Sequence, residues 1–369
     1  MFLKFTPFIV IALGILFGAH YLLYVSFTHL FGIININAKT ILAAVLGFLS
    51  VSFILSSLWI HFQKNFLTKT FYLLSGIWLG LALNLLLAIL LVKILTGVSG
   101  LAGYNLNAVP VAVILFILAV AYSVYGVWNA FNPITKNIEV SVKNLPAEWQ
   151  GKTIVQLSDI HLGNVYGENF MKSVVEKTNA LNPDLVVITG DLFDGMDGDL
   201  TSTVTPLNDL RAPKGVLFVT GNHETYFGVQ RVYDILRKTK VRILNDETIE
   251  INGIRFIGIS YPENFGSKDI NEVFKKAGPN AAAPTILLWH SPTQTGKAKQ
   301  NGVNLQLSGH THKGQLFPFG FITQAVYKGY DYGLHQDNNF FIYASSGVGT
   351  WGPAMRTGNR PEIVAIRLK

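Results

Sequence analysis

Short polar motifs made of Asp, His, Asn and Gly follow the ends of several apolar runs between residues 150 and 315. Five of the nine histidines of the chain stand in these motifs. In chain order the motifs are Ser158-Asp159-Ile160-His161, Gly190-Asp191, Gly221-Asn222-His223-Glu224, Trp289-His290 and Gly309-His310-Thr311-His312. Random scatter does not concentrate histidines in this way, so the motifs predict one shared site.

The donor atoms that these motifs offer are carboxylate and amide oxygens and imidazole nitrogens. Such a set suits Mn, Fe or Zn better than Ca. The chain has no cysteine, which excludes disulfides, a thiolate nucleophile and a zinc finger. Two divalent cations about 3.5–4 Å apart can clamp a phosphoryl group and generate hydroxide at neutral pH. The motifs therefore predict a site for two cations.

The spacing inside the motifs also favours convergence. In Asp159-x-His161 and His310-x-His312 the paired side chains are two positions apart. On an extended chain such side chains point the same way, so both members of a pair are expected to face one cleft, though not necessarily one ion. A glycine directly precedes Asp191, Asn222 and His310 and permits tight turns there.

Strands are needed to position the motifs. Predicted strands are Thr153–Leu157, Asp184–Thr189, Val216–Thr220, Ile254–Ile259, Thr285–Trp289, Leu305–Leu307, Phe340–Ala344 and Glu362–Arg367, with helices at Glu168–Leu181, Gln230–Lys238 and Ile270–Lys276. Continuous apolar runs such as Pro284–Trp289 are typical of strands that are covered on both faces. The alternation predicts a layered α/β domain, in which sites form at the carboxyl ends of strands.

The ordered set of motifs resembles the calcineurin-like metallophosphoesterase family. All five family blocks stand in order with no ligand position substituted, over about Lys152–Lys369. The tail Tyr343–Lys369 is also similar to membrane-anchored bacterial members, which tend to end with a Gly-rich loop, an Arg and a Pro-Glu-Ile strand. The resemblance implies a four-layer α/β/β/α sandwich with the site at its sheet edge.

The resemblance also implies a role for each donor. One metal would be held by Asp159, His161 and His312, the other by Asn222, His290 and His310, and Asp191 would bridge both. His223 matches the family's non-ligand histidine, which is expected to protonate the leaving oxygen or to stabilise the transferring phosphoryl group. Such a proton donor typically contributes ~10²–10⁴-fold in rate. Attack would come from a metal-bridging hydroxide.

Other polar residues have less specific patterns. Glu224 is either a partner that orients a ligating histidine or a solvated surface residue. Arg356 and Arg360, in the Gly-rich tail, are surface residues or binders of substrate phosphate. Three acidic residues form a loop that is predicted to be solvated rather than ligating: Asp194, Asp197 and Asp199.

Four apolar stretches precede the motifs, and each is long enough to cross a hydrocarbon core of ~30 Å. They are Phe8–Thr28, Thr40–Ile60, Phe71–Leu95 and Ala108–Trp128. No Asp or Glu precedes Glu139, whereas buried helices of a soluble protein would carry a charged stripe. The first stretch has no clear small-x-small site, so we expect an uncleaved helix rather than a signal peptide. The predicted organisation is a transmembrane unit at 1–130, a linker at 131–150 and a catalytic domain at 151–369.

Charges indicate an orientation and exclude one class of partner. With the N-terminus inside, five lysines would be cytoplasmic and two external, which favours a cytoplasmic catalytic domain at the cell membrane. The cytoplasmic set is Lys4, Lys64, Lys69, Lys136 and Lys143, and the external set is Lys39 and Lys93. From Glu139 onward 23 basic residues face 22 acidic ones, so we expect no nucleic acid partner. The expected partners are a phosphorylated substrate, lipid-linked compounds included, and membrane lipids.

The sequence thus predicts a membrane-anchored, dinuclear metal-dependent phosphohydrolase acting on phosphomonoester, phosphodiester or diphosphate bonds. Two other classes stay open. The phosphoesterase-like domain could regulate a membrane sensor or transporter, which charged residues inside the membrane helices would favour; none lies deep in those stretches. A catalytically silent binding module would be favoured by substituted ligand positions, and none is substituted.

Overall fold

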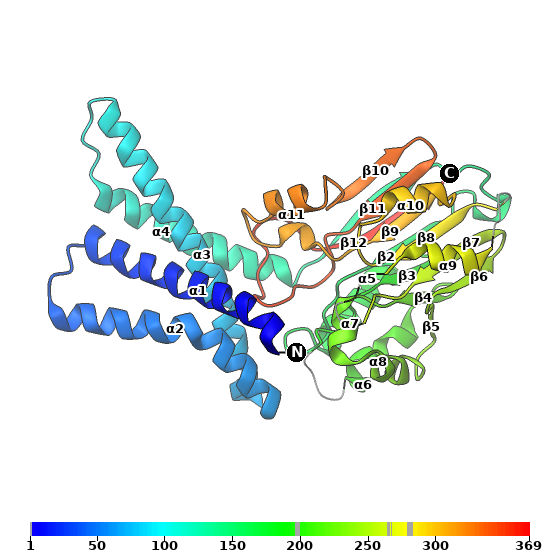
Figure 1. The fold of residues 1–369 in the computed structure, drawn as a ribbon, viewed down its shortest axis with the longest axis horizontal. Coiled ribbons are helices and arrows are strands. Elements are labelled where there is room, and N and C mark those ends of the chain that lie inside the picture. The colour runs from blue at the N-terminus through cyan, green and yellow to red at the C-terminus, as the bar shows by residue number, and fades with distance from the viewer. Residues whose placement is uncertain (1, 196–199, 264–265, 267, 279–282) are drawn as a thin grey trace. The chain divides into compact units, whose positions relative to one another are not determined.

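The computed structural model describes residues 2–195, 200–263, 266, 268–278 and 283–369 (Figure 1). The chain divides into two compact units. Unit 1 comprises Met1–Trp128 and Gly352–Met355, and unit 2 comprises Asn129–Trp351 and Arg356–Lys369.

Unit 1 is built on apolar helices. They are α1 (Phe2–Leu30), α2 (Ile36–Phe62), α3 (Phe66–Leu101) and α4 (Ala108–Ala130). Each contains one of the predicted stretches and is long and apolar enough to span a membrane, which confirms that prediction. Asparagines begin two of them: the side chain of Asn35 accepts from the N–H groups of Asn37 and Ala38, and Asn65 caps α3 in the same way.

Unit 2 contains two six-stranded sheets among its described residues. The first has the order β1 (Ile134–Val140), β12 (Glu362–Leu368), β2 (Thr153–Leu157), β3 (Leu185–Thr189), β4 (Val216–Val219) and β5 (Val241–Ile243). The second has the order β10 (Gly333–Asp337), β11 (Phe340–Ala344), β9 (Leu305–Ser308), β8 (Thr285–Trp289), β7 (Ile254–Ile259) and β6 (Glu247–Ile251). Strands β2 to β5 are parallel, as are β7, β8, β9 and β11.

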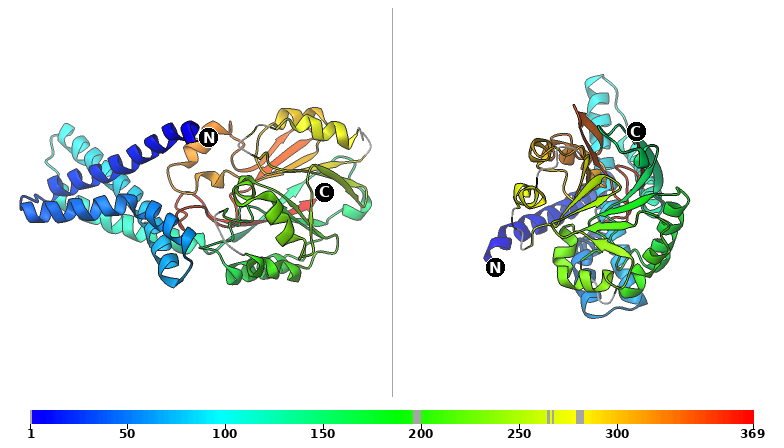
Figure 2. Two further views of the ribbon diagram at one scale, coloured as in Figure 1. Left: turned by 60° about the horizontal axis from the view of Figure 1, so that its bottom comes forward. Right: turned by 90° about the vertical axis from the view of Figure 1, so that its right-hand side faces the viewer.

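Successive residues of the central strands pack on opposite faces of the sheet. Ile154 of β2 packs between the sheets, and the next residue, Val155, packs under the helices of the first sheet. Those helices are α5 (Glu168–Asn179) and α8 (Val229–Leu236), while α9 (Ile270–Ala277) and α10 (Thr295–Gln300) cover the second sheet. In the left view of Figure 2 the green and the yellow helices lie on opposite outer faces of the sheets. The predicted four-layer α/β/β/α sandwich is therefore confirmed.

Shorter helices connect these elements. They are α6 (Thr201–Val204), α7 (Asn222–Phe227), α11 (Gly320–Val326) and the 3₁₀ turns Ala147–Trp149, Thr205–Asp209 and His312–Gly314. Two of them begin at a predicted donor, because α7 starts at Asn222 and the last 3₁₀ turn starts at His312.

The segment 131–150, predicted as a linker, contains structure of its own. Strand β1 pairs in parallel with β12 along its whole length. Trp149 is fully buried, and its indole N–H donates to the carbonyl of Ile251 at 3.0 Å. These residues form part of the sandwich, because β1 adds an edge strand whose outward positions are polar and therefore resemble a linker in composition.

Candidate metal centre

The five predicted motifs meet at one edge of the sandwich. They follow the carboxyl ends of β2, β3, β4, β8 and β9, which is where parallel strands place their loops. The structure brings all seven predicted ligand residues together there, in two adjacent groups of donor atoms. His223 lies beside them, with its ring centroid 4.5 Å from that of His161.

The first group consists of Asp159, His161 and His312. The Nε2 atoms of the two histidines face each other at 3.0 Å. His312 Nε2 lies 3.4 Å from Asp159 Oδ1. All three side chains are buried, with at most 2% of their surface exposed.

The second group consists of Asp191, His290 and His310, with Asn222 beside them. His290 Nε2 lies 3.1 Å from Asp191 Oδ2, 3.2 Å from Asn222 Oδ1 and 3.2 Å from His310 Nδ1. His290 is held in this orientation because its Nδ1–H donates to the carbonyl of Thr189 at 2.7 Å.

Asp191 lies between the two groups. Its Oδ2 is 3.1 Å from His290 Nε2 and 4.0 Å from His161 Nε2. Its Oδ1 accepts from the backbone N–H of His223 at 2.9 Å. One carboxylate oxygen thus faces a histidine of each group, which is the position that a bridging ligand needs.

The backbone at these donors differs from the extended chain that the pair spacing suggested. Five of the seven predicted ligand residues have positive φ angles, between 48° and 76°: Asp159, His161, Asp191, His310 and His312. The two members of each pair therefore converge through left-handed turns after the strands have ended. Non-glycine residues rarely adopt this conformation, and where they do they cluster at functional sites. The H-x-H pair is also divided, with His310 in the second group and His312 in the first.

Glycine is required where the loops touch. A Cβ on Gly309 would lie 1.9 Å from Ser158 Oγ and 2.1 Å from Asp159 Oδ2. The backbone N–H that follows, that of His310, donates to both oxygens of Asp159 at 2.9 and 3.1 Å. The missing side chain lets the β9 loop approach close enough to orient this carboxylate.

We expect Gly309→Ala to weaken metal binding by about 10–100-fold, the range typical of lost outer contacts to ligands. The added methyl group must displace Asp159 or Ser158. Gly296→Ala is the matched control, because a Cβ there meets nothing within 4 Å and an exposed helical Gly→Ala change is neutral or stabilising. Metal titration followed by thermal unfolding measures both; equal affinities in the two variants would contradict this reading.

Glu224 joins two of the loops. It is fully buried and accepts three backbone N–H groups, from Asp191 at 2.9 Å, Phe193 at 3.1 Å and Gly221 at 2.6 Å. Burial, and next the charge of Asp191, raise its pKa to about 7. Of the two alternatives for Glu224, the structure shows the orienting partner and not the solvated surface residue, although the residue acts on the backbone rather than on a histidine.

Asp194 was predicted to be solvated, and this is wrong. Its carbonyl accepts from His223 Nδ1 at 2.7 Å, and its Oδ1 lies 3.4 Å from His161 Nδ1. Its side chain is only 15% exposed, and the donor atoms of Asp194, His161 and His223 also lie close enough together to hold a cation. The contact could not be predicted from the acidic stretch in the sequence, because only the fold brings Asp194 against two histidines. Asp197 and Asp199 lie outside the described residues.

The charge states of the histidines suit metal ligands. Burial, and then the charge of His290, lower the pKa of His310 to about 3. Burial also holds the pKa of His312 well below its usual value. For His290 burial acts in the same direction, but Asp191 outweighs it and raises the pKa to about 9. The imidazoles of His310 and His312 are therefore neutral, as metal ligands must be, whereas His290 has to give up a proton when it binds a cation.

The donor geometry fits cations. Atoms that each lie about 2.0–2.2 Å from one ion are separated from one another by roughly 3.0–3.5 Å. The separations of 3.0 to 3.4 Å within both groups match this range. His161 Nδ1 is buried without a hydrogen-bond partner and faces Asp194, so Nε2 is the nitrogen turned toward the first group.

Arg356 is neither a surface residue nor free to bind a substrate. It is fully buried, its Nε donates to the carbonyl of Gly349 at 3.1 Å, and its Nη2 lies 3.0 Å from His312 Nδ1. It packs behind the first group of donors.

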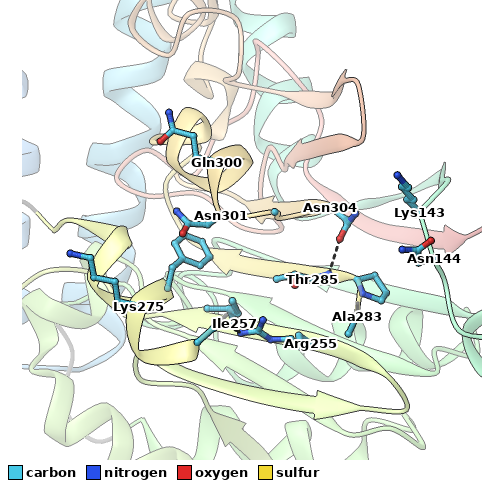
Figure 3. A pocket seen from close by; sticks show the side chains of 14 residues that line it. Lys143, Asn144, Arg255, Ile257, Lys275, Ala283, Thr285, Gln300, Asn301 and Asn304 are labelled. Carbon is cyan, nitrogen blue, oxygen red and sulfur yellow. Dashed lines mark hydrogen bonds between the residues drawn. The ribbon is translucent and has the colours of Figure 1, made fainter. Parts of the chain in front are cut away.

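A separate pocket of about 600 Å³ lies at the other ends of the second sheet's strands (Figure 3). It is lined by Arg255 at the start of β7, Thr285 at the start of β8 and Asn304 just before β9. The side chain of Asn304 accepts from the N–H of Thr285 at 2.8 Å, and Arg255 donates to carbonyls at the end of α9. No predicted site residue lines this pocket, and the polar groups named here make hydrogen bonds that hold neighbouring elements together.

Comparisons with known proteins agree with the geometry. Residues 152–314 match the family model described as calcineurin-like phosphoesterase. An uncharacterized metallophosphoesterase of Campylobacter jejuni is 35% identical over 262 residues, which cover 69% of this chain and 68% of the relative. The transmembrane protein with metallophosphoesterase domain of Bos taurus is 35% identical over 268 residues, covering 67% of this chain and 60% of that protein. An uncharacterized metallophosphoesterase of Aquifex aeolicus is 32% identical over 261 residues, which cover 68% of this chain and 98% of that protein. The chain belongs to the calcineurin-like metallophosphoesterase family.

Proposed function

We propose that the chain is a membrane-anchored phosphohydrolase that works with two divalent cations. The observation that carries the proposal is the pair of buried donor groups with Asp191 Oδ2 between a histidine of each, at 3.1 Å from His290 Nε2 and 4.0 Å from His161 Nε2. Asp159, His161 and His312 would hold one cation, and Asn222, His290 and His310 the other. The complete donor set favours an enzyme over a silent binding module.

Two bound cations would supply Lewis acidity toward the phosphoryl oxygens and a water of lowered pKa for direct attack. The protein contributes orientation: Thr189 fixes the ring of His290, and Glu224 ties the loops of Asp191 and Asn222 together. No cysteine is available for a covalent intermediate.

His223 is placed to give a proton to the leaving oxygen. Its Nδ1–H donates to the carbonyl of Asp194, which leaves Nε2 as the nitrogen that can exchange a proton. Burial lowers the pKa of His223, but Asp191 and Asp194 outweigh burial and raise it above the usual value. A histidine that stays protonated closer to neutral pH is the better acid.

For His223→Asn we expect hydrolysis to fall by about 10²-fold or more, the contribution typical of a positioned acid. The content of bound metal should stay unchanged, because His223 is not one of the seven ligands. His335→Asn, in β10 and outside the site, is the control. Metal loss in step with the lost activity would instead make His223 a ligand.

We also propose that the domain faces the cytoplasm of a cell membrane, as the distribution of lysines favours. A reporter active only in the cytoplasm, fused after Lys369, tests the orientation. Activity of a reporter that works only outside would overturn it.

The hydrolase proposal is tested with the full chain in detergent. After treatment with a chelator, the protein receives Mn²⁺, Zn²⁺ or Fe²⁺ and is assayed on p-nitrophenyl phosphate and bis(p-nitrophenyl) phosphate. We expect metal-dependent hydrolysis of at least one of the two. No hydrolysis with any of these ions, despite metal bound at the site, would refute the proposal.

A further inference from the structure

We infer that the site acts on phosphoesters carried by membrane lipids, and that the apolar segment Phe317–Val326 inserts into the lipid surface beside it. The inference rests on the proposed hydrolase function and adds the substrate class to it.

The exposed apolar side chains of unit 2 are concentrated in this segment. Among the described residues of the unit, nine large apolar side chains are exposed, and five of them lie between residues 317 and 326. The five are Phe317 (45%), Phe319 (41%), Phe321 (68%), Ile322 (59%) and Val326 (65%). Helix α11, which forms the second part of the segment, has no buried residue. Scattered exposed apolar residues are normal, but a contiguous patch marks a contact surface.

The charges around the segment suit a lipid surface. No Asp, Glu, Lys or Arg occurs from Gln315 to Tyr327, and a lysine stands on each side, at Lys313 and Lys328. The next acidic residue, Asp331, is 6% exposed and accepts from the hydroxyl of Thr323 at 2.9 Å. Aromatic and aliphatic side chains flanked by lysines are typical of elements that lie in the headgroup region.

The segment adjoins the donor groups. The ring of Tyr327, the residue after α11, is nearly perpendicular to that of His310, with the ring centroids 6.0 Å apart. Across the site, the rings of Tyr226 and Trp351 lie 5.2 and 6.5 Å from that of His223. Tyr226 and Trp351 are themselves among the exposed apolar residues of unit 2. Aromatic side chains therefore lie beside both His310 and His223.

The chain connection to the helices that are apolar enough to span a membrane favours lipid as the occupant of this surface. Only residues 131–133 separate α4 from β1, at most about 10 Å of extended chain. A second segment, Gly352–Met355, belongs to unit 1, where Met355 Sδ lies 3.9 Å from Asn84 Nδ2 of α3. The residues next to this segment, Trp351 and Arg356, are the ones beside His223 and His312.

The reaction is a hydrolysis. One water is consumed, its oxygen forms the new bond to phosphorus, and the bond from phosphorus to the leaving oxygen breaks. The leaving oxygen takes a proton from His223, and the proton that the attacking water loses passes to solvent, from which His223 is protonated again. The apolar part of the lipid would stay in the bilayer while the phosphoester reaches the donors.

The first test compares substrates in two physical states. The full chain is assayed on phosphatidylcholine vesicles that contain phosphatidic acid or phosphatidylglycerol, and on soluble p-nitrophenyl phosphate and bis(p-nitrophenyl) phosphate. For the double variant Phe321→Ser/Ile322→Ser we expect kcat/KM on vesicles to fall at least about tenfold, as the loss of buried apolar surface implies, with the soluble rates unchanged. Gln324→Ser, an exposed polar position in the same helix, is the control and should change neither.

The second test does not depend on activity. Because the chain has no cysteine, Phe321→Cys carries a nitroxide label at one place only. In the protein reconstituted in bilayers we expect the label at 321 to be accessible to oxygen and shielded from a water-soluble nickel chelate. A label on Lys238→Cys, at an exposed position in the turn after α8, should show the reverse.

The outcomes separate the two proposals. Hydrolysis of the soluble substrates alone, with a water-exposed label at 321, would overturn the lipid inference and leave the hydrolase intact. A shielded label together with no hydrolysis of any substrate would refute the hydrolase and, with it, the inferred substrate class.

Discussion

Asp191→Asn should reduce hydrolysis to the rate of buffer with metal alone. Asp191 is the residue whose carboxylate faces both donor groups, at 3.1 Å from His290 Nε2 and 4.0 Å from His161 Nε2. An amide presents one oxygen and no charge, so neither cation is held in place. Because enzymes typically accelerate their reactions by about 10⁶-fold or more, we expect a loss of at least ~10⁴-fold.

The substitution nearly preserves shape. The Asn oxygen can still accept from the N–H of His223, as Asp191 Oδ1 does, so the fold should persist. Its control is Asp234→Asn, because Asp234 is an exposed carboxylate on α8 and should keep full activity. Circular dichroism and metal content accompany the assay. Near-normal activity of Asp191→Asn in metal-replete protein would remove Asp191 from the site.

Removal of the metal should abolish activity and destabilise unit 2. Without cations, the imidazoles and carboxylates of the site remain buried and lack the metal ions that they would otherwise bind. A ligand that binds only the folded state stabilises it by about 2.7 kcal/mol at 100 times its Kd. For a domain of this size the melting temperature should therefore rise by roughly 5–10 °C on adding Mn²⁺ or Zn²⁺ to chelator-treated protein.

Thermal unfolding of wild type and Asp191→Asn, each with and without metal, measures the effect. The wild type should show the shift, and the variant should show little of it. An equal shift in both proteins would mean that the stabilising ion binds elsewhere.

The central strands could be predicted from sequence because their apolar runs match their burial. Strands β2, β7, β8 and β11 have the predicted bounds, since both of their faces are covered. Strands β1, β5, β6 and β10 were missed. They are short or half exposed, and their polar positions leave no continuous apolar run.

The sequence predicted correctly that these side chains lie together, because residue type and order indicate a common site at the ends of the strands; their role as metal ligands stays a prediction. The features of the site that sequence reasoning missed are those that depend on the fold. Asp194 stands in an acidic stretch that reads as solvent-exposed, and only the fold brings it against His161 and His223. The left-handed turns at Asp159 and His161 could not be predicted either, because side chains two apart suggest extended chain.

Anomalous X-ray scattering from crystals of the Mn²⁺-loaded full chain tests the shared site most directly. We predict two peaks: one bonded to Asp159, His161 and His312, the other to Asn222, His290 and His310, with Asp191 in contact with both. A single peak, or peaks away from these side chains, would contradict the two-cation account of this protein.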